Sequence, residues 1–519
     1  MGEGLLLFYQ TKLKKEYKYA FFTTFFIGLL IHLYKFANTL PNHDSVYNYY
    51  TDQNILDLGR WALSWSCGIS SYWDLPWVIG VLSCFFIALT TVTIVALFKI
   101  NNPILIGLIG ALLAASPSTT ETFFFLYTAD GYMIAMFLAA MAVYLSRIEE
   151  TRKFSMVFSC ICICISCGIY QAYVSFALIL AICYFIDILF QGKHDNQTCF
   201  KWVLQQVIIY TVSLTVYYII WQLSMYFTNT VANSYQGVSD IGKISTGFLI
   251  NSFVKSIKSI IIYFLQWNVF EHGFTFYSVI NIIFLVAMVA GILIAFIRSN
   301  ISSRKWSITL LVLCLTAIIP FSCIWNFASA NIGYRPMMLQ CLTLLFVLVA
   351  VIYERWANQI SKDAICLLLI LIIFNNALMA NISYFYMNLC YERTYAEAVE
   401  MISEIHDLQD EYDIKNIAIL GSRLDDVQLP TTNYETGKIA PAGKIHLLSM
   451  MLEESLLYDS IHTTLFLKTT FGLDLPELDT DQINLLINTD DVRNMGCWPA
   501  GNSIRVINDT LVIKFSSEL

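Results

Sequence analysis

Three acidic residues stand at the ends of long apolar segments, where a carboxylate could act on a substrate held in a membrane. Asp44 follows about twenty nearly uninterrupted apolar residues, and Glu121 and Asp130 flank the stretch "TFFFLYTA". A carboxyl group in partly desolvated surroundings has a raised pKa and can take a proton from a hydroxyl group. We therefore expect the three acids to be catalytic candidates that converge on one cavity. The alternative is that each caps a helix N-terminus or is simply solvated.

Two arginines in predicted outer segments, on the same side of the membrane as the three acids, are suited to bind a phosphate group. Arg60 lies in "LGRW" and Arg335 in "NIGYRP", and a guanidinium can grip a phosphate with two parallel hydrogen bonds. Tyr170 and Gln171, in "YQAY", are expected to line the substrate cavity together with Tyr334. For the "YQAY" pair, a hydrogen bond between two helices is an equally open alternative.

The elements that must position these residues are membrane-spanning helices. The chain has 519 residues, of which 57% are hydrophobic and 13% charged, and its mean hydropathy is +0.62. These values are typical of an integral membrane protein and lie outside the range of soluble globular proteins. Windows of about 19 residues predict about eleven spans, at 19–38, 76–98, 103–119, 131–147, 154–169, 171–190, 202–225, 274–297, 306–325, 336–353 and 363–384.

The distribution of basic residues predicts the orientation of these spans. With a cytoplasmic N-terminus, the predicted inner segments hold fifteen lysines and arginines, and the outer segments before Tyr391 hold six. Basic residues are enriched in cytoplasmic loops, so this asymmetry supports that orientation. An odd number of spans then places the C-terminal part on the extracytoplasmic side.

A change in composition near Tyr391 predicts a domain boundary. Residues 391–519 contain 22 acidic and 9 basic residues, and no segment long enough to span a membrane. They combine a helical pattern, "YAEAVEMISEIHDLQDEY", with a short strand, "KNIAILG", and with two alternating runs around Asn508-Asp509 that predict a β-hairpin. We expect a transmembrane catalytic domain over residues 1–390 and a small α/β extracytoplasmic domain over residues 391–519.

Two predicted outer segments, 39–75 and 226–273, are long and aromatic, which favours function on the outer face. Within the second segment, "FLINSFVKSIKSIIIYFLQW" places polar residues on one helical face and apolar residues on the other. A helix of this kind is expected to lie in the membrane interface rather than to cross the membrane.

Several common motifs are absent from the sequence. It contains no P-loop, no GxGxxG between a strand and a helix, no HExxH and no Cys/His metal spacing. Nucleotide chemistry on the outer face is therefore unsupported, and we expect no nucleic-acid partner. No metal site or certain cofactor is indicated, although three converging carboxylates would permit a divalent cation.

An ordered set of short motifs extends over nearly the whole chain. It comprises "NHDS" after the first span, "DLGRW" at Asp57 to Trp61, "LPWVIG" at the second span, "TADGYM" around Asp130, and the ending "MGCWPAGNSIRVINDTLVIKF". In these motifs the chain resembles the bacterial Gtr-type membrane glucosyltransferases, the serotype-converting glucosyltransferase II family, which have the GT-C architecture. The resemblance implies a polytopic α-helical membrane protein of GT-C type with a small α/β extracytoplasmic domain.

The resemblance also implies a reaction. The donor would be a polyprenyl-phosphate hexose, with glucose as the expected sugar, and the acceptor an envelope polysaccharide such as O-antigen. The site would face outward from the bacterial cytoplasmic membrane, among membrane lipids, and a flippase and a donor synthase of the same pathway would be partners. In GT-C enzymes the acid of the first outer loop is catalytic, and that position falls on Asp44. Asp44 would deprotonate the acceptor hydroxyl in a single inverting displacement, while Arg60 or Arg335 would hold the leaving phosphate.

Other classes of protein compete with this interpretation. A transporter or flippase of lipid-linked glycans would also have many spans, but it predicts functional charges near the membrane midplane. Here the candidate charges lie at the predicted outer edge, which favours an enzyme. A glycan polymerase or ligase of the same envelope pathway would share the outer-face chemistry. A scaffold that presents the C-terminal domain is disfavoured by the absence of adhesive repeats.

Overall fold

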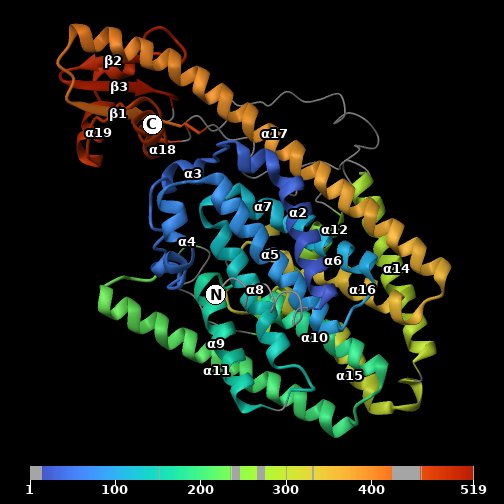
Figure 1. Ribbon diagram of the computed structural model, residues 1–519. Helices are drawn as coiled ribbons and strands as arrows, with labels where there is room; N and C mark the ends of the chain where they lie inside the picture. Colours follow the sequence, from blue (N-terminus) through green and yellow to red (C-terminus); the bar gives the residue numbers. More distant parts are fainter. Residues whose placement is uncertain are drawn as a thin grey trace, which may run out of the picture. The chain divides into compact units, whose positions relative to one another are not determined.

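The computed structural model describes residues 14–150, 152–233, 235, 246–265, 275–299, 301–329, 332–422, 456–457 and 459–517. The described residues form two compact units (Figure 1). Residues 14–38 and 50–381 make up a helical unit, and residues 39–49, 382–422, 456–457 and 459–517 make up a C-terminal unit. The long helix α17 (Gln359–Glu411) contributes its first part to one unit and its second part to the other. The domain division predicted at Tyr391 remains a prediction.

The helical unit is built from α-helices joined by short 3-10 turns. Besides the first part of α17, its elements are α2 (Lys15–Ala37), η1 (Leu56–Leu58), α4 (Leu63–Tyr72), α5 (Pro76–Phe98), α6 (Pro103–Ala115), α7 (Pro117–Phe124), η2 (Leu126–Thr128), α8 (Ala129–Leu145), α9 (Lys153–Ile169), α10 (Tyr173–Gln191), α11 (Asn196–Thr228), α12 (Thr246–Leu265), α14 (Phe276–Arg298), η4 (Ile301–Ser303), α15 (Lys305–Ser322), η5 (Ile324–Phe327), η6 (Pro336–Leu342) and α16 (Thr343–Trp356). Proline stands at the first position of several of them, where its missing N–H costs nothing.

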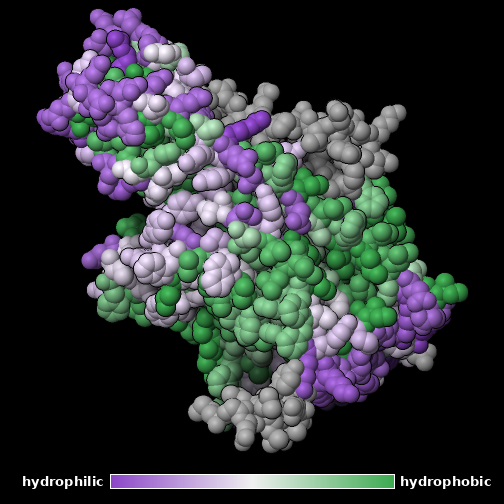
Figure 2. Space-filling model, turned by 45° about the horizontal axis from the view of Figure 1, so that its top comes forward, coloured by the Kyte–Doolittle hydropathy of each residue, from purple (hydrophilic) through white to green (hydrophobic). Residues whose placement is uncertain are grey.

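Eleven helices of the described residues are long and apolar enough to cross a membrane. Figure 2 shows a mainly hydrophobic surface over the helical unit, as expected where lipid replaces water. The predicted fold class, a polytopic helical membrane protein, is thus confirmed. The set of helices differs from the predicted one at two places. Lys153–Ile169 has only 17 residues and falls short of the length of a span, whereas Gly247–Leu265 meets the length and hydropathy of a span.

The interfacial position predicted for α12 remains a prediction, and its contacts join it to η5 and α14. Its Ser252 donates a hydrogen bond to the carbonyl oxygen of Asn326, which follows the last turn of α15. Its Tyr263 carbonyl oxygen accepts a hydrogen bond from the hydroxyl of Tyr277, in the first turn of α14. The two halves of α12 thus contact different elements: Ser252 contacts η5, and Phe264 stacks on Phe284, the ninth residue of α14.

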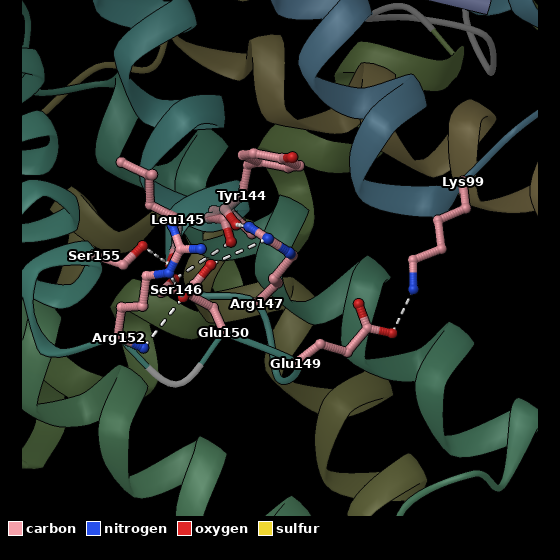
Figure 3. Close-up of polar contacts among 10 residues, drawn as sticks. Lys99, Tyr144, Leu145, Ser146, Arg147, Glu149, Glu150, Arg152 and Ser155 are labelled. Atoms are coloured by element: carbon pink, nitrogen blue, oxygen red, sulfur yellow. Dashed lines mark hydrogen bonds and ion pairs between the residues drawn. The ribbon is translucent and has the colours of Figure 1, made fainter. Parts of the chain in front are cut away.

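The ends of α5 and α8 that were predicted to face the cytoplasm carry ion pairs (Figure 3). Lys99 Nζ lies 2.5 Å from Glu149 Oε1, and Arg147 Nη2 lies 3.1 Å from Glu150 Oε2. Arg152 approaches the same Glu150 at 3.9 Å. The pairs of Lys99 and Arg152 involve exposed cations, and ion pairs of that kind contribute little to stability. They do keep both signs of charge together just beyond the last turn of α8.

The C-terminal unit contains a three-stranded sheet in the order β1-β3-β2. Strand β1 (Asn416–Leu420) runs parallel to β3 (Thr510–Lys514), and β2 (Ile504–Ile507) runs antiparallel to it. Strands β2 and β3 form the predicted hairpin, with Asn508 in its turn at a φ of 59°. Figure 2 shows that the surface of this unit is mainly hydrophilic.

Four helices and the second part of α17 complete the C-terminal unit around two apolar cores. The four helices are α3 (His43–Asn48), α18 (Ser460–Phe471), α19 (Thr480–Ile487) and α20 (Asp490–Arg493). Helix α3 is distant in sequence, but its Val46 is buried in a core that includes Phe466 of α18 and Leu511 of β3. The segment after the first span thus packs with residues more than 400 positions away.

A close approach of α2 and α6 predicts how one glycine affects stability. A Cβ added to Gly110 would lie 2.0 Å from Thr24 Oγ1 and 3.0 Å from Thr24 Cβ. We expect Gly110→Ala to destabilise the protein by about 1–3 kcal/mol, because the two helices must move apart. The check is the thermal unfolding midpoint of the detergent-solubilised protein. Gly107→Ala on the same helix is the matched control, because its Cβ would meet Tyr19 only at 3.7 Å. Equal midpoints for the two variants would contradict the close packing.

Candidate active site

The backbone before Arg60 is held in a turn that only glycine fits. Gly59 has a φ of 81°, and a Cβ there would lie 2.5 Å from the Tyr217 hydroxyl and 2.8 Å from Gln171 Nε2. Gln171 donates a hydrogen bond of 2.6 Å to the carbonyl oxygen of Leu58, and Tyr217 donates one of 3.1 Å to that of Gly59. Gln171 was predicted to line a substrate cavity. In the structure it holds the turn that presents Arg60.

The Arg60 guanidinium is fixed against two stacked tyrosines. Tyr132 and Tyr170 stack with ring centroids 4.3 Å apart, and the guanidinium carbon lies 4.7 Å from the centroid of the Tyr170 ring. Arg60 Nη1 also donates a hydrogen bond of 2.8 Å to the Tyr132 hydroxyl. Arg60 Nε is buried and has no hydrogen-bond partner among the described residues. A buried, unpartnered donor on a fixed cation suits an anionic ligand.

Glu121 and Arg335 also lie near Tyr170. The Glu121 carboxylate accepts a hydrogen bond from the backbone N–H of Met337 and interacts electrostatically with Arg335. Both charges are close enough to Tyr170 to influence its hydroxyl, and burial raises the pKa of that phenol, which keeps it neutral. The structure therefore brings Arg60, Tyr170, Glu121 and Arg335 into one cluster, drawn from helices that are far apart in sequence.

Arg335 contacts two aromatic residues. Its guanidinium carbon lies 5.8 Å from the Phe125 ring centroid, and its Nη2 lies 3.4 Å from the Tyr235 hydroxyl. Tyr334, its neighbour, accepts a hydrogen bond of 3.0 Å from the backbone N–H of Trp325. Tyr334 thus ties its loop to η5.

Asp130 forms contacts away from the Arg60 cluster. Its Oδ2 accepts a hydrogen bond of 2.5 Å from Ser70, and its Oδ1 accepts one of 2.9 Å from the backbone N–H of Gly131. The side chain is buried, and these bonds anchor α4 to the first turn of α8. Asp130 thereby supports the segment that follows Arg60.

Asp44 belongs to the C-terminal unit, in the first turn of α3. Asn42 caps this helix, since its side chain accepts a hydrogen bond of 2.8 Å from the Ser45 backbone N–H. The Asp44 carboxylate therefore does not serve as the N-cap, which was its alternative role. The predicted convergence of Asp44 with Glu121 and Asp130 joins residues of two units and remains a prediction.

Sequence reasoning missed Tyr132 and Tyr217 as partners of the Arg60 turn. Tyr132 was visible only as part of "TADGYM", and its position in the first turn of α8, two residues after Asp130, was the available signal. Among the described residues no group of three or more His, Cys, Asp or Glu side chains could hold a metal ion.

Eleven candidate spans among the described residues define a multi-pass membrane protein, and a partly buried cation, stacked tyrosines and a carboxylate form its candidate site. Residues 33–331, more than half of the chain, match the family described as Glucosyl transferase GtrII, and the chain belongs to this family. It is therefore a membrane glucosyltransferase, as the motifs predicted. No curated protein and no solved structure matches the chain. The matched residues include Arg60, Glu121 and Tyr170 but end before Arg335.

The hydrogen bond between Tyr132 and Arg60 predicts a kinetic effect. Tyr132→Phe keeps the stacked ring and leaves a charged donor without its partner, so we expect glucose-transfer efficiency to fall by about tenfold. The measurement is kcat/KM in membranes that contain equal amounts of protein. Tyr210→Phe is the control, because the buried Tyr210 hydroxyl has no hydrogen-bond partner among the described residues. Equal efficiencies for both variants would show that the bond has no role in activity.

Asp74 predicts a pH dependence of stability. Burial raises the pKa of its carboxyl to about 6, although its Oδ2 accepts a hydrogen bond of 2.7 Å from the Tyr50 backbone N–H. The folded state then binds more protons than the unfolded state between about pH 4 and pH 6, so stability falls as pH rises through this window. Asp74→Asn stays neutral, and we expect its thermal midpoint to exceed that of the wild type above pH 6 and to approach it near pH 4. A pH-independent difference would contradict the raised pKa.

Proposed function

We propose that the protein is an inverting hexosyltransferase that moves glucose from a polyprenyl-phosphate donor to an envelope glycan on the outer face of the bacterial cytoplasmic membrane. Family membership supports the transfer of glucose. The observation that carries the choice of donor is Arg60, whose buried Nε has no partner among the described residues. A lipid-linked phosphate is an anion delivered at membrane depth, which is what such a cation suits.

The proposed roles of the two arginines follow from their surroundings. Arg60 is preorganised by its hydrogen bond to Tyr132 and its contact with Tyr170, so little reorganisation accompanies charge development on the leaving phosphate. Arg335 is partly exposed and lies near the same tyrosine, and we assign it the second contact to the phosphate. Tyr334 and Gln171 support the loops that carry these cations.

The proposed chemical step is one displacement at the anomeric carbon. Asp44 accepts the proton of an acceptor hydroxyl while that oxygen forms a bond to the anomeric carbon. The bond from this carbon to the phosphate oxygen breaks, and polyprenyl phosphate leaves with the electron pair. Configuration inverts, because a single displacement forms no covalent intermediate. Asp130 stays a candidate for a supporting role through α4.

The proposed orientation has a cytoplasmic N-terminus and an extracytoplasmic C-terminal unit. The ion pairs of Lys99, Arg147 and Arg152 occupy the end of α5 and α8 that would face the cytoplasm. Tyr132 lies at the opposite end of α8, and Arg60 is hydrogen-bonded to it, so both would face outward. The small hydrophilic unit would then help to receive the polymeric acceptor.

The test of this function is transfer of labelled glucose from polyprenyl-phosphate glucose in membranes, with a nucleotide-sugar donor run in parallel. We expect transfer from the lipid donor alone, and Asp44→Asn should reduce kcat by about 100-fold or more. Asp52→Asn is the matched control, because Asp52 is an exposed acid of the same outer segment, whose Oδ1 accepts a hydrogen bond from Asn54.

Two results would contradict the proposal. Transfer from the nucleotide sugar but not from the lipid donor would exclude the proposed donor. Unimpaired transfer by Asp44→Asn at normal protein level would remove Asp44 as the base, whatever the donor.

A further inference from the structure

Glu121 contacts the start of a helix that it does not belong to. It lies on α7, and its carboxylate accepts a hydrogen bond from the backbone N–H of Met337, the second residue of η6. The first N–H groups of any helix lack partners within that helix. The N-cap residue of η6 is Arg335, whose side chain makes no capping hydrogen bond. Glu121 thus supplies from another helix the cap that η6 lacks.

The charge of Glu121 acts on the same short segment. A negative group is favoured near the N-terminus of a helix, where the N–H dipoles point outward. Arg335 interacts electrostatically with Glu121, while its guanidinium remains near Tyr235 and Phe125. One buried carboxylate, 5% exposed, therefore holds the backbone just after Arg335 and attracts its side chain.

Other hydrogen bonds keep α7 and η6 together. Gln340 Oε1 accepts a hydrogen bond of 3.0 Å from Ser116, and Gln340 Nε2 donates one of 3.2 Å to Thr119. These bonds are neutral and lie further along η6. The α7–η6 contact therefore has one charged part, at Glu121, and one uncharged part, at Gln340.

We propose that Glu121 is a positioning residue, which sets the place of Arg335 for a phosphate-bearing lipid, and that it is not the catalytic base. This inference rests on the proposed function for the identity of the ligand. Each interaction of Glu121 uses the carboxylate as a hydrogen-bond acceptor or as a negative charge.

The experiment is a double-mutant cycle between Glu121 and Arg335. Glu121→Gln keeps an amide oxygen for the Met337 N–H and removes the charge. We expect it to weaken binding of polyprenyl phosphate to the purified protein in detergent by about tenfold, and to lower kcat at saturating donor by less than about threefold. Arg335→Ala should weaken binding further. In the Arg335→Ala background, Glu121→Gln should have no added effect on binding, because it acts through that arginine.

Gln340→Met is the matched control. It breaks the neutral hydrogen bonds of the same two helices, with Ser116 and Thr119, and leaves the charges in place. We expect it to lower the thermal midpoint without weakening lipid binding. An equal loss of binding in Gln340→Met and Glu121→Gln would show a merely structural role and overturn the proposal.

Other outcomes also decide the question. A fall in kcat of about 100-fold or more in Glu121→Gln, with unchanged binding, would make Glu121 the base. The positioning role would also be overturned if the fold-losses of binding from Glu121→Gln and Arg335→Ala multiply in the double variant. It would equally be overturned if the wild type binds no polyprenyl phosphate. If the wild type binds the lipid and the cycle gives the expected result, but no glucose is transferred from the lipid donor, only the proposed function is refuted. If glucose is transferred from the lipid donor, but the two substitutions affect binding independently, only this inference is refuted.

Discussion

The contact between the Arg60 guanidinium and the Tyr132–Tyr170 stack is the interaction on which the arrangement of the candidate site depends. A cation removed from water must find compensation, and here it comes from one ring face and one hydroxyl group. Glycine at position 59 is needed because the turn that delivers the arginine has a positive φ and no room for a side chain. The remaining donor, Nε, is buried and has no hydrogen-bond partner in the part of the chain that the structure describes.

The same constraint applies to two other buried acids of the helical unit, Asp187 and Asp130. Asp187 of α10 lies 3.1 Å from Arg355 of α16, and Arg355 also donates a hydrogen bond to the carbonyl oxygen of Phe98. Asp130 is satisfied by Ser70 and a backbone N–H group. A charge inside a membrane protein persists when it is paired or hydrogen-bonded, since hydrocarbon offers no alternative partner. These pairs connect helices and thereby position the site.

Much of the fold could be predicted from local patterns. Long apolar segments separated by short polar ones predict helices that cross a membrane, because each span must satisfy its own backbone hydrogen bonds. The β-hairpin was predictable from alternation around Asn508, and the segment containing α12 from its amphipathic character. The number of spans was harder to predict near α9, because a helix of 17 residues lies at the lower limit of length for crossing a membrane.

The candidate site was predicted as a set of residue types rather than as an arrangement. Arg60, Arg335, Glu121 and Tyr170 were identifiable because charges and polar pairs at the ends of apolar segments are costly and need a reason. The supporting roles of Tyr132 and Gln171 were not identifiable, because a tyrosine or a glutamine at the end of a span has several equally common roles. The convergence of Asp130 with Asp44 and Glu121 could not be decided from the sequence pattern either, and the Asp130 carboxylate accepts a hydrogen bond from Ser70 of α4.

The sequence by itself determined that the chain inserts into a membrane, that it belongs among glucosyltransferases, and which charged residues stand at the ends of its spans. Hydropathy, periodicity and motifs are properties of neighbouring residues, so they can be read along the chain. Only the tertiary structure decided that Glu121 caps a helix more than 200 residues away and that α3 packs in the C-terminal unit. Such contacts depend on how helices pack against one another, and helices of similar hydropathy could pack in many ways until their side chains select one.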